Sequence, residues 1–567
     1  MIARAIPGDQ PRWLVAVILA LIVLLSLTPS LRLLLEALSQ LDQGSASPLM
    51  RVLRDGATWQ ALSNSLYTST LATIISLMLG ALFACSLSLT NVSGRQWLVF
   101  CFMLPMMIPP QVTALSWLQL FGPSSPLLNS LGLAPALGSP QPLYSAEGIA
   151  LLMGVQHAPL VFLTLRASLI NLPAEMIEAA RINGAGQGRV WLDVIFPLSR
   201  SGLVAAAAIA FVSALGNFGI PAMLGIPASY YVLPTLIYQH MAGFGQGVLS
   251  EVAVLSMMIG ALALAGVLIQ QRFVRRAQYE LVGHSGRAQA FVLDRAHRLG
   301  LQVFLWLLLA LILVAPLVAL VVSSVVPALG VGLTADTFTL NAYVEMLTRQ
   351  GVTGRAMSNS LVLAGGSALF LMLLSLPLAW LLLRMHPRLR TAITSMIEIP
   401  YALPGVVLAI ACILLFVQPL PLLDISLYGT LAILFVAYLA RFMSIALKPV
   451  QASAGQLDGS LEEAAQLAGA GPLRRLLQIV LPLVAPAVCA GGLLVFLTAV
   501  NELTVSALLW SAGNETLGVL VFNLDEGGDS VLAAAISVVI VVMVVGLMSL
   551  LSLMGRWLPE GVIPWRT

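Results

Sequence analysis

The chain has 567 residues, of which 59% are hydrophobic and only 9% are charged, and its mean hydropathy is +0.97. This composition excludes a soluble globular domain and indicates an all-α polytopic membrane protein. The formal net charge of +3 is small, and we attribute it to membrane topology rather than to nucleic-acid binding.

Twelve apolar segments are long enough to cross a membrane as helices, since about 20 residues span a hydrocarbon core of about 30 Å. The first six lie near 13–35, 61–89, 97–121, 147–170, 200–224 and 248–270. The other six lie near 299–325, 358–384, 392–417, 428–449, 484–510 and 530–555. We interpret the first segment as a retained helix, because it is too long for the apolar region of a signal peptide; a cleaved signal is the weaker alternative.

Basic residues in short loops predict the orientation, because Lys and Arg near the ends of spans resist translocation. Arginines gather in alternate loops: Arg4, Arg12, Arg95, Arg189, Arg200, Arg272, Arg275, Arg276, Arg287, Arg295, Arg298, Arg384, Arg388 and Arg390. The intervening loops read as acidic or neutral, as at Glu515, Asp525, Glu526 and Asp529. We therefore expect a multi-pass protein of a bacterial inner membrane, in contact with lipid and with both termini in the cytoplasm.

One polar pattern occurs twice, and each residue of the second copy follows its counterpart by 285 positions. The first copy is Glu178, Ala179, Ala180, Gly184 and Pro197; the second is Glu463, Ala464, Ala465, Gly469 and Pro482. Such an offset, about half the chain, predicts two related halves.

A second set of matches supports the repeat, at an offset of 295. Asn64-Ser65-Leu66 matches Asn359-Ser360-Leu361, and Pro105 with Pro109 matches Pro400 with Pro404. Since six spans separate the copies, the halves are parallel repeats about an axis along the membrane normal. We expect a first repeat at 1–271, a basic cytoplasmic linker at 272–298 and a second repeat at 299–567.

The polar segments 174–197 and 459–482 predict two short helices joined by a glycine turn. A bend of this kind is not expected in lipid, where its backbone groups would lack partners, but it suits docking against another protein. Glu178 and Glu463 are expected near a helix start, where an acidic side chain is favourable.

These segments resemble the cytoplasmic loop signature of ABC importer permeases that work with solute-binding proteins. The second copy fits every position of the signature, with Ile479, Leu481 and Pro482, whereas the first has Val194 and Phe196 before Pro197. The resemblance implies the type I ABC importer permease fold. It also implies that 174–197 and 459–482 are coupling loops that dock into ATPase subunits.

The fused arrangement further resembles the ferric iron importer permeases. Segments such as Asn217-Phe218-Gly219-Ile220-Pro221 and Asn501-Glu502-Leu503-Thr504 are similar to stretches in that branch. The resemblance implies iron transport, with thiamine, phosphonate or another small solute as the alternative within the class. An ion-coupled secondary transporter or a channel subunit is the alternative from other classes, and the paired loops argue against both.

No nucleotide site is predicted within this chain. A phosphate-binding loop requires Gly-Lys followed by Ser or Thr, and the single lysine, Lys448, precedes Pro449. We therefore expect a permease that is not itself an enzyme and binds no cofactor. A separate ATPase, in two copies for two loops, would hold ATP and Mg²⁺, and a periplasmic solute-binding protein would deliver the solute.

Polar side chains within the spans are candidates for the translocation pathway, because such groups are costly in lipid. We single out Asn217, Glu398, Asn501 and Glu502, of which Asn217 and Glu502 are equivalent at the offset of 285. Carboxylates suit a hard ferric ion. The alternative, which we prefer, is that Glu398 and Glu502 pair with Arg166, Arg441 or Asn501 to stabilise the bundle. His157 is expected to pack in the bundle, and no bound metal is predicted.

Overall fold

The computed structural model describes residues 12–39, 44, 47–136, 138–170, 172–243, 247–276, 291–349, 351–419 and 424–554. Within these ranges the secondary structure is helical, apart from one isolated β-bridge between Thr90 and Phe291. Ten helices are long and apolar enough to cross a membrane, and two bent helix pairs bring the number to twelve. The predicted all-α polytopic architecture is therefore confirmed.

Five of the six spans of the first half lie close to the predicted segments, whereas span five begins at Gln187, ahead of its predicted start near 200. The six spans are α1–η2–α2 (Arg12–Ile22, Val23–Leu27, Thr28–Ala37), α4 (Gly56–Leu89), α5 with α6 (Arg95–Met107, Pro110–Leu120), α8 (Ala146–Ile170), α10–η4–α11 (Gln187–Arg189, Val190–Ile195, Phe196–Leu215) and α14 (Val248–Arg276). The shorter helices are α3 (Pro48–Arg54), α7 (Pro126–Ser130), α9 (Ala174–Ile182), α12 (Gly219–Gly225) and α13 (Leu233–Met241).

The second half repeats this order. Its spans are α15–η5–α16 (Arg295–Leu309, Ala310–Val314, Ala315–Ser324), α18 (Gly351–Arg384), α19 with α20 (Pro387–Ala402, Gly405–Phe416), α21 (Leu431–Ala454), α23–η7–α24 (Pro472–Arg475, Leu476–Val480, Leu481–Val500) and α27 (Ser530–Met554). Its shorter elements are α17 (Asn341–Val344), η6 (Glu345–Arg349), α22 (Gly459–Leu467), α25 (Ser506–Leu509) and α26 (Leu517–Glu526). The predicted linker 272–298 falls partly outside the described residues, and the domain boundaries stay a prediction.

Spans three and nine are broken rather than straight. The axes of α5 and α6 differ by 102°, and those of α19 and α20 by 103°. Each break falls just before a proline, Pro109 or Pro404, because proline lacks the N–H that would continue the helix and disfavours helical geometry in the residue before it. Pro105 and Pro400 lie inside helices.

Four spans widen into a short π-helical turn immediately before a proline-containing turn. These turns are η2, η4, η5 and η7, and the prolines that follow are Pro29, Pro197, Pro316 and Pro482. A proline leaves a carbonyl of the preceding turn without its usual donor, and a π bulge accommodates the mismatch. The recurrence at equivalent places shows that the two halves share these local distortions.

Spans five and eleven end earlier than predicted. The helix α11 stops at Leu215 and α24 at Val500, so the predicted ends at 224 and 510 are wrong. In both halves a short helix follows after a turn, and its start is capped by a buried polar side chain, as described below. An apolar sequence alone does not show this interruption.

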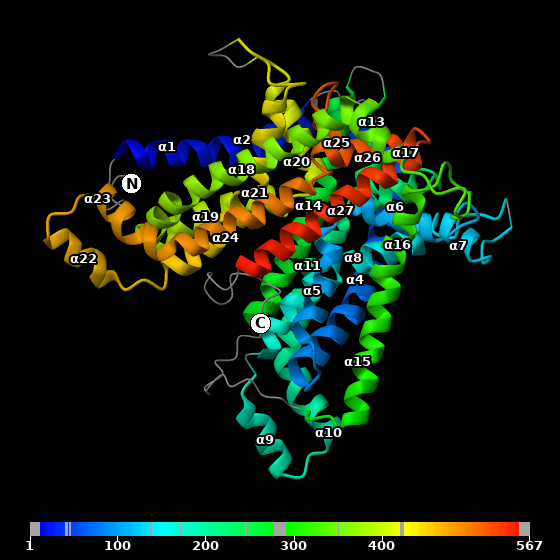
Figure 1. Cartoon of the computed structure of the whole chain (residues 1–567). Helices are drawn as coiled ribbons and strands as arrows, with labels where there is room; N and C mark the ends of the chain where they lie inside the picture. The colour runs from blue at the N-terminus through cyan, green and yellow to red at the C-terminus, as the bar shows by residue number, and fades with distance from the viewer. Residues whose placement is uncertain are drawn as a thin grey trace.

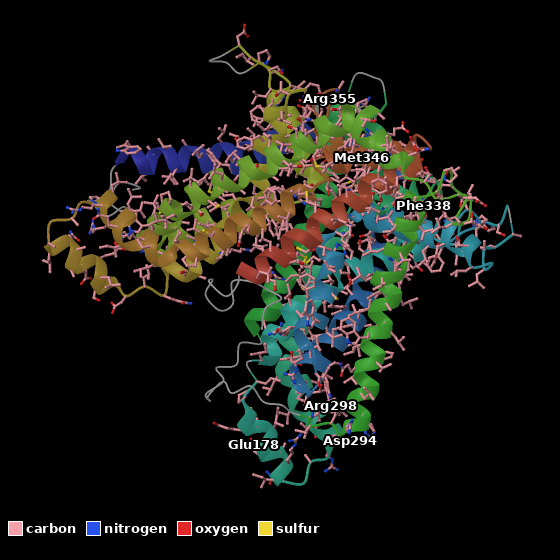
Figure 2. All side chains as sticks on the ribbon, viewed as in Figure 1. Glu178, Asp294, Arg298, Phe338, Met346 and Arg355 are labelled. Carbon is pink, nitrogen blue, oxygen red and sulfur yellow. The ribbon has the colours of Figure 1, made fainter. Side chains whose placement is uncertain are left out.

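The two halves form two diverging arms, one with α9 at its tip and the other with α22 at its tip (Figure 1). The first span of each half leaves its own arm: α2 packs against α20, whereas α15 and α16 pack against α5 and α6. This exchange ties the halves together. Glu178, Asp294 and Arg298 lie at one end of the molecule, and Phe338, Met346 and Arg355 at the opposite end (Figure 2).

Candidate functional site

Each polar loop has the predicted short helix and glycine turn, but the predicted second short helix is wrong, because that helix continues through Pro197 or Pro482 as span five or eleven. After α9 the chain turns at Gly184 (φ +79°), and after α22 it turns at Gly469 (φ +81°). A residue in this left-handed conformation favours glycine, which ends each helix. Pro197 and Pro482 stand in the first turn of the next helix. Glu178 and Glu463 lie mid-helix, so their predicted place near a helix start is wrong.

Both short helices expose the same kinds of side chain. Glu178 and Glu463 are exposed, and so are the last apolar residues, Ile182 (86%) and Leu467 (91%). Ile182 and Leu467 are equivalent at the offset of 285. A single exposed apolar side chain is common on any protein, but the same exposure at two equivalent positions is consistent with a surface that binds another protein.

The two short helices are anchored differently. On α9, Ile177 is buried at 2% exposure. At the equivalent place on α22, Glu462 forms an ion pair with Arg384 and accepts a hydrogen bond from Trp380 Nε1 at 3.3 Å. Asp458 caps the start of α22, and the bond from the Ser460 backbone N–H holds the pKa of its carboxyl below the usual value.

The polar anchor of α22 leads to a first prediction. We expect Arg384→Ala to loosen α22 while leaving α9 in place, because it leaves Glu462 with one partner fewer at a site about one-fifth exposed. The local cost is about 1–2 kcal/mol. Hydrogen–deuterium exchange should rise in residues 459–467 and not in 174–182. An equal rise in exchange in the two helices would contradict the different anchoring of α9 and α22.

A cavity of about 890 Å³ lies between the two halves. All four predicted pathway residues, Asn217, Glu398, Asn501 and Glu502, line it. Among the described residues the charged lining comes entirely from the second half, whereas the first half contributes neutral polar groups. The charged set is Glu398, Arg441, Lys448 and Glu502; the neutral set from the first half is Gln156, His157, Thr164, Ser213 and Asn217.

Glu502 belongs to a buried ionic cluster in the second half. Arg441 Nε donates to Glu502 Oε2 at 3.1 Å, and Arg441 Nη1 donates to the Leu403 carbonyl at 3.4 Å, where span nine breaks. Glu502 Oε1 accepts from the Val505 backbone N–H at 2.8 Å, which begins the short helix α25. The cluster therefore joins spans nine, ten and eleven.

The first half repeats this cluster with neutral groups. Asn217 Nδ2 donates to Gln156 Oε1 at 3.3 Å, and Asn217 Oδ1 accepts from the Ile220 N–H at 3.2 Å. Gln156 Nε2 also donates to the Ile108 carbonyl at 3.5 Å, at the break of span three. Gln156 and Arg441 are equivalent at the offset of 285. Composition and motifs alone do not single out Gln156, although the offset of 285 from Arg441 identifies it.

The contacts of the remaining predicted polar residues can be compared with the expectations. Glu398 pairs with Lys448 at 3.2 Å, so its expected pairing with Arg166, Arg441 or Asn501 is wrong. The expected pairing of Glu502 with Arg441 is confirmed. Asn501 Nδ2 donates to the Met107 carbonyl of the other half. His157 is buried in the cavity wall, as expected. Among the described residues no three His, Cys, Asp or Glu side chains group to hold a metal.

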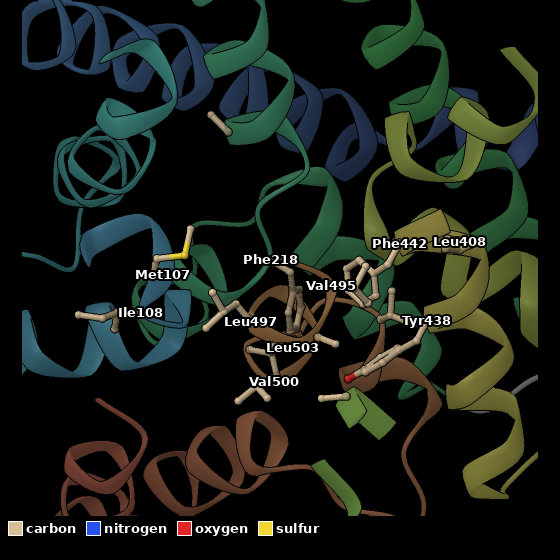
Figure 3. Packing of buried hydrophobic residues seen from close by; sticks show 14 of the residues in the cluster. Met107, Ile108, Phe218, Leu408, Tyr438, Phe442, Val495, Leu497, Val500 and Leu503 are labelled. Carbon is tan, nitrogen blue, oxygen red and sulfur yellow. The ribbon is translucent and has the colours of Figure 1, made fainter. Parts of the chain in front are cut away.

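The cavity is open on the side toward which the two arms diverge, where their tips carry α9 and α22. Lys448 and Glu398 are about half exposed, and a second pocket of about 480 Å³ shares Glu398 and continues to Arg390 and Gln451. The other side is packed with buried apolar side chains from both halves, among them Phe218, Leu497, Val500 and Leu503 (Figure 3). These side chains form an apolar seal, so the cavity is accessible from one side.

Three aromatic side chains belong to this seal. The ring centroids of Tyr238 and Phe522 are 6.0 Å apart, and those of Phe218 and Phe522 are 6.1 Å apart. Tyr238 and Phe522 hold matching positions in α13 and α26. Two equivalent residues that touch each other must lie on the axis relating the halves, so the seal closes the centre of the molecule.

A family model described as the binding-protein-dependent transport system inner membrane component matches residues 76–279 and 371–563. The chain belongs to this family. It is thus a fused, two-domain permease subunit of an ABC importer, a multi-pass membrane component rather than an enzyme. Its partners are of the kinds that such an importer has, an ATPase and a solute-binding protein.

Several curated relatives resemble this permease. A putative ferric transport system permease protein, FbpB 1 of Haemophilus influenzae, is 27% identical over 90% of this chain and 80% of its own. The ferric transport system permease FbpB of Actinobacillus pleuropneumoniae is 25% identical over 95% of this chain and 77% of its own. The molybdenum transport permease ModB of Escherichia coli is 29% identical but covers only 38% of this chain, and 93% of its own.

Among solved structures, the permease is similar to a chain of a bacterial alginate ABC transporter in complex with an alginate-bound periplasmic protein. The sequence identity is 17% and the TM-score 0.38, with 46% of this chain and 94% of that chain covered.

Proposed function

We propose that this permease imports ferric iron delivered by a periplasmic binding protein, by alternating access driven by ATP hydrolysis on two ATPase copies. The substrate assignment rests on how much of this chain each relative matches. The two ferric permeases match at least 90% of it, whereas the molybdenum permease matches only 38% of it. Two coupling helices with matched exposed side chains support two ATPase contacts.

We propose that Asn217, Glu398, Asn501 and Glu502 form part of the pathway. They line the cavity between the halves, and the two carboxylates offer the oxygen ligands that a hard cation prefers. Both carboxylates already have a cationic partner, Lys448 or Arg441. A ferric ion would therefore exchange with these cations rather than bind to free carboxylates.

A second candidate is an anionic solute. Arg441 and Lys448 place two cations in the same cavity, and permeases for molybdenum and for 2-aminoethylphosphonate match part of this chain. Oxyanions are recognised by such cations. Thiamine remains a further alternative.

The test is uptake of radiolabelled ferric iron in cells that express the permease with the ATPase and binding protein of its own operon. The Glu178→Arg/Glu463→Arg variant is the comparison, at equal membrane abundance. Uptake that the double variant loses supports both substrate and coupling. No uptake by an intact complex overturns the iron assignment and directs the assay to molybdate, phosphonates and thiamine. Undiminished uptake in the variant contradicts the coupling role.

The end that carries the coupling helices is proposed to be cytoplasmic, with both termini on that side. Its loops hold most of the arginines, but the opposite face is not free of them, since Arg51 pairs there with Glu251 at 3.0 Å. A reporter fused to the C-terminus that fluoresces only in the cytoplasm is expected to be bright. Activity of a C-terminal alkaline phosphatase fusion, which requires export, would contradict this orientation.

A further inference from the structure

Gln111 is a completely buried glutamine at the seam between the halves. It is the second residue of α6, in the first half, and its exposure is 0%. Its side chain packs against the second half so closely that a Cβ added at Gly518 would lie 2.8 Å from Gln111 Nε2. That Cβ would also lie 3.5 Å from the Glu502 carbonyl oxygen, so Gln111 is near the ionic cluster.

The side-chain amide of Gln111 has no hydrogen-bond partner at either end among the described residues. Leaving a buried amide unpaired costs free energy, and such a group in a native structure calls for an explanation. By contrast, Gln119, two turns further along α6, accepts a hydrogen bond from Ser323 at 2.8 Å.

The resting structure does not need a polar residue at this place. The equivalent position in the second half, at the offset of 295, is Val406, which is also fully buried. An apolar side chain thus satisfies the same local fold. The unpaired amide of Gln111 costs free energy in this conformation, which suggests that it forms hydrogen bonds in a different conformation of the permease.

The position of Gln111 identifies that other state. Pro110, the preceding residue, lines the central cavity. A Cβ added at Gly219 would lie 3.2 Å from the Gln111 backbone nitrogen and 3.4 Å from Cδ2 of Leu503, a residue of the apolar seal. Any opening of the cavity to the outer face must part the two halves at this seam. It would uncover Gln111.

We propose that Gln111 contacts the solute when the seam opens to the outside, an inference that rests on the alternating access proposed above. An amide supplies two donors and one acceptor, so it suits a solute that presents oxygen atoms and bound water. A metal ion within a shell of oxygen ligands and an oxyanion share this chemistry. Uptake with iron and with molybdate distinguishes the two.

The first experiment compares Gln111→Leu with Gln119→Leu in the assembled complex in liposomes. For Gln111→Leu we expect unchanged or higher thermal stability. The solute moved per ATP hydrolysed should fall by roughly fivefold or more, the factor that one lost hydrogen bond gives. For Gln119→Leu we expect lower stability and an unchanged ratio. A Gln111→Leu complex with the wild-type ratio, or with stability and ratio reduced together, overturns the proposal.

A second measurement does not depend on knowing the solute. Gln111→Cys, in a chain whose four native cysteines are replaced by serine or alanine, is treated from outside with a membrane-impermeant thiol reagent. Labelling is expected only when vanadate traps the ATPases. If Gln111→Cys is labelled neither with nor without vanadate, the proposal is overturned. If it is labelled with vanadate but the complex imports no iron, only the assignment of iron as the substrate is wrong.

Discussion

Replacement of Arg441 by leucine is expected to destabilise the permease far more than the matching change Gln156→Leu. Arg441 balances Glu502, which is 8% exposed, and also binds the Leu403 carbonyl at the break of span nine. Removing one member of a buried ion pair leaves an uncompensated charge, at a cost of about 3–5 kcal/mol. Because the cavity admits water beside Arg441, we expect a value near the lower end, about 3 kcal/mol.

The matched change in the first half removes only neutral hydrogen bonds. Gln156→Leu leaves Asn217 without one of its partners, at 3.3 Å, and exposes no charge. We expect a loss of about 1–2 kcal/mol. Thermal unfolding of the two purified variants in the same detergent, followed by size-exclusion chromatography, measures the difference. Equal losses would show that the ionic character of the second cluster does not matter for stability.

A double variant separates folding from transport. Arg441→Gln/Glu502→Asn gives the second half the chemistry of the first, and we expect it to recover most of the stability that Arg441→Leu loses. If the charged side chains of Arg441 and Glu502 interact with the solute, this stable variant should still lose uptake. A stable variant with normal uptake would instead assign the ion pair to the bundle alone.

The repeat was predictable from the sequence because the same contacts recur in both halves. Asn64 and Asn359 each donate to a backbone carbonyl after span five or eleven, at 2.8 and 3.0 Å. Ser65 and Ser360 each accept from the first backbone N–H of α13 or α26, at 2.8 Å. Because the same side chains make the same bonds in both halves, these positions match in the sequence and an offset reveals them.

The ends of spans five and eleven were not predictable from composition. The chain remains apolar beyond Leu215 and Val500, and hydropathy gives no reason for it to turn there. The turn depends on Asn217 and Glu502, which cap the following short helices from inside the bundle. Each bond joins a residue in the turn to a backbone N–H three positions further on, at the start of a short helix, and a window that averages hydropathy does not detect it.

The pairing of Glu398 could not be foreseen for a different reason. Lys448 is 50 positions away and has an apolar counterpart, Leu163, in the first half, so the repeat gives no hint of it. The pair forms because α19 and α21 pack side by side, with Lys448 also near the Tyr401 ring at 5.8 Å. Only the packing of the two spans brings these side chains together.

Ile182→Asp and Leu467→Asp are each expected to weaken ATPase binding without affecting the fold. At 86% and 91% exposure, neither side chain stabilises the permease, so the change in its unfolding free energy should stay within about 0.5 kcal/mol. If each side chain is buried in an ATPase subunit, its loss removes about 1.5–3 kcal/mol of apolar burial. That corresponds to a roughly tenfold to hundredfold weaker contact.

Recovery of the ATPase with the affinity-purified permease measures the effect, together with ATPase stimulation by the loaded binding protein. Leu133→Asp is the matched control, since Leu133 is 69% exposed in a loop on the opposite face and should leave ATPase recovery unchanged. Ile182→Leu and Leu467→Met should also retain binding. Because α22 is held by an ion pair and α9 by apolar packing, the two sites need not respond equally. Normal ATPase recovery with both aspartates present would remove the exposed apolar residues from the coupling contact and leave Glu178 and Glu463 as its candidates.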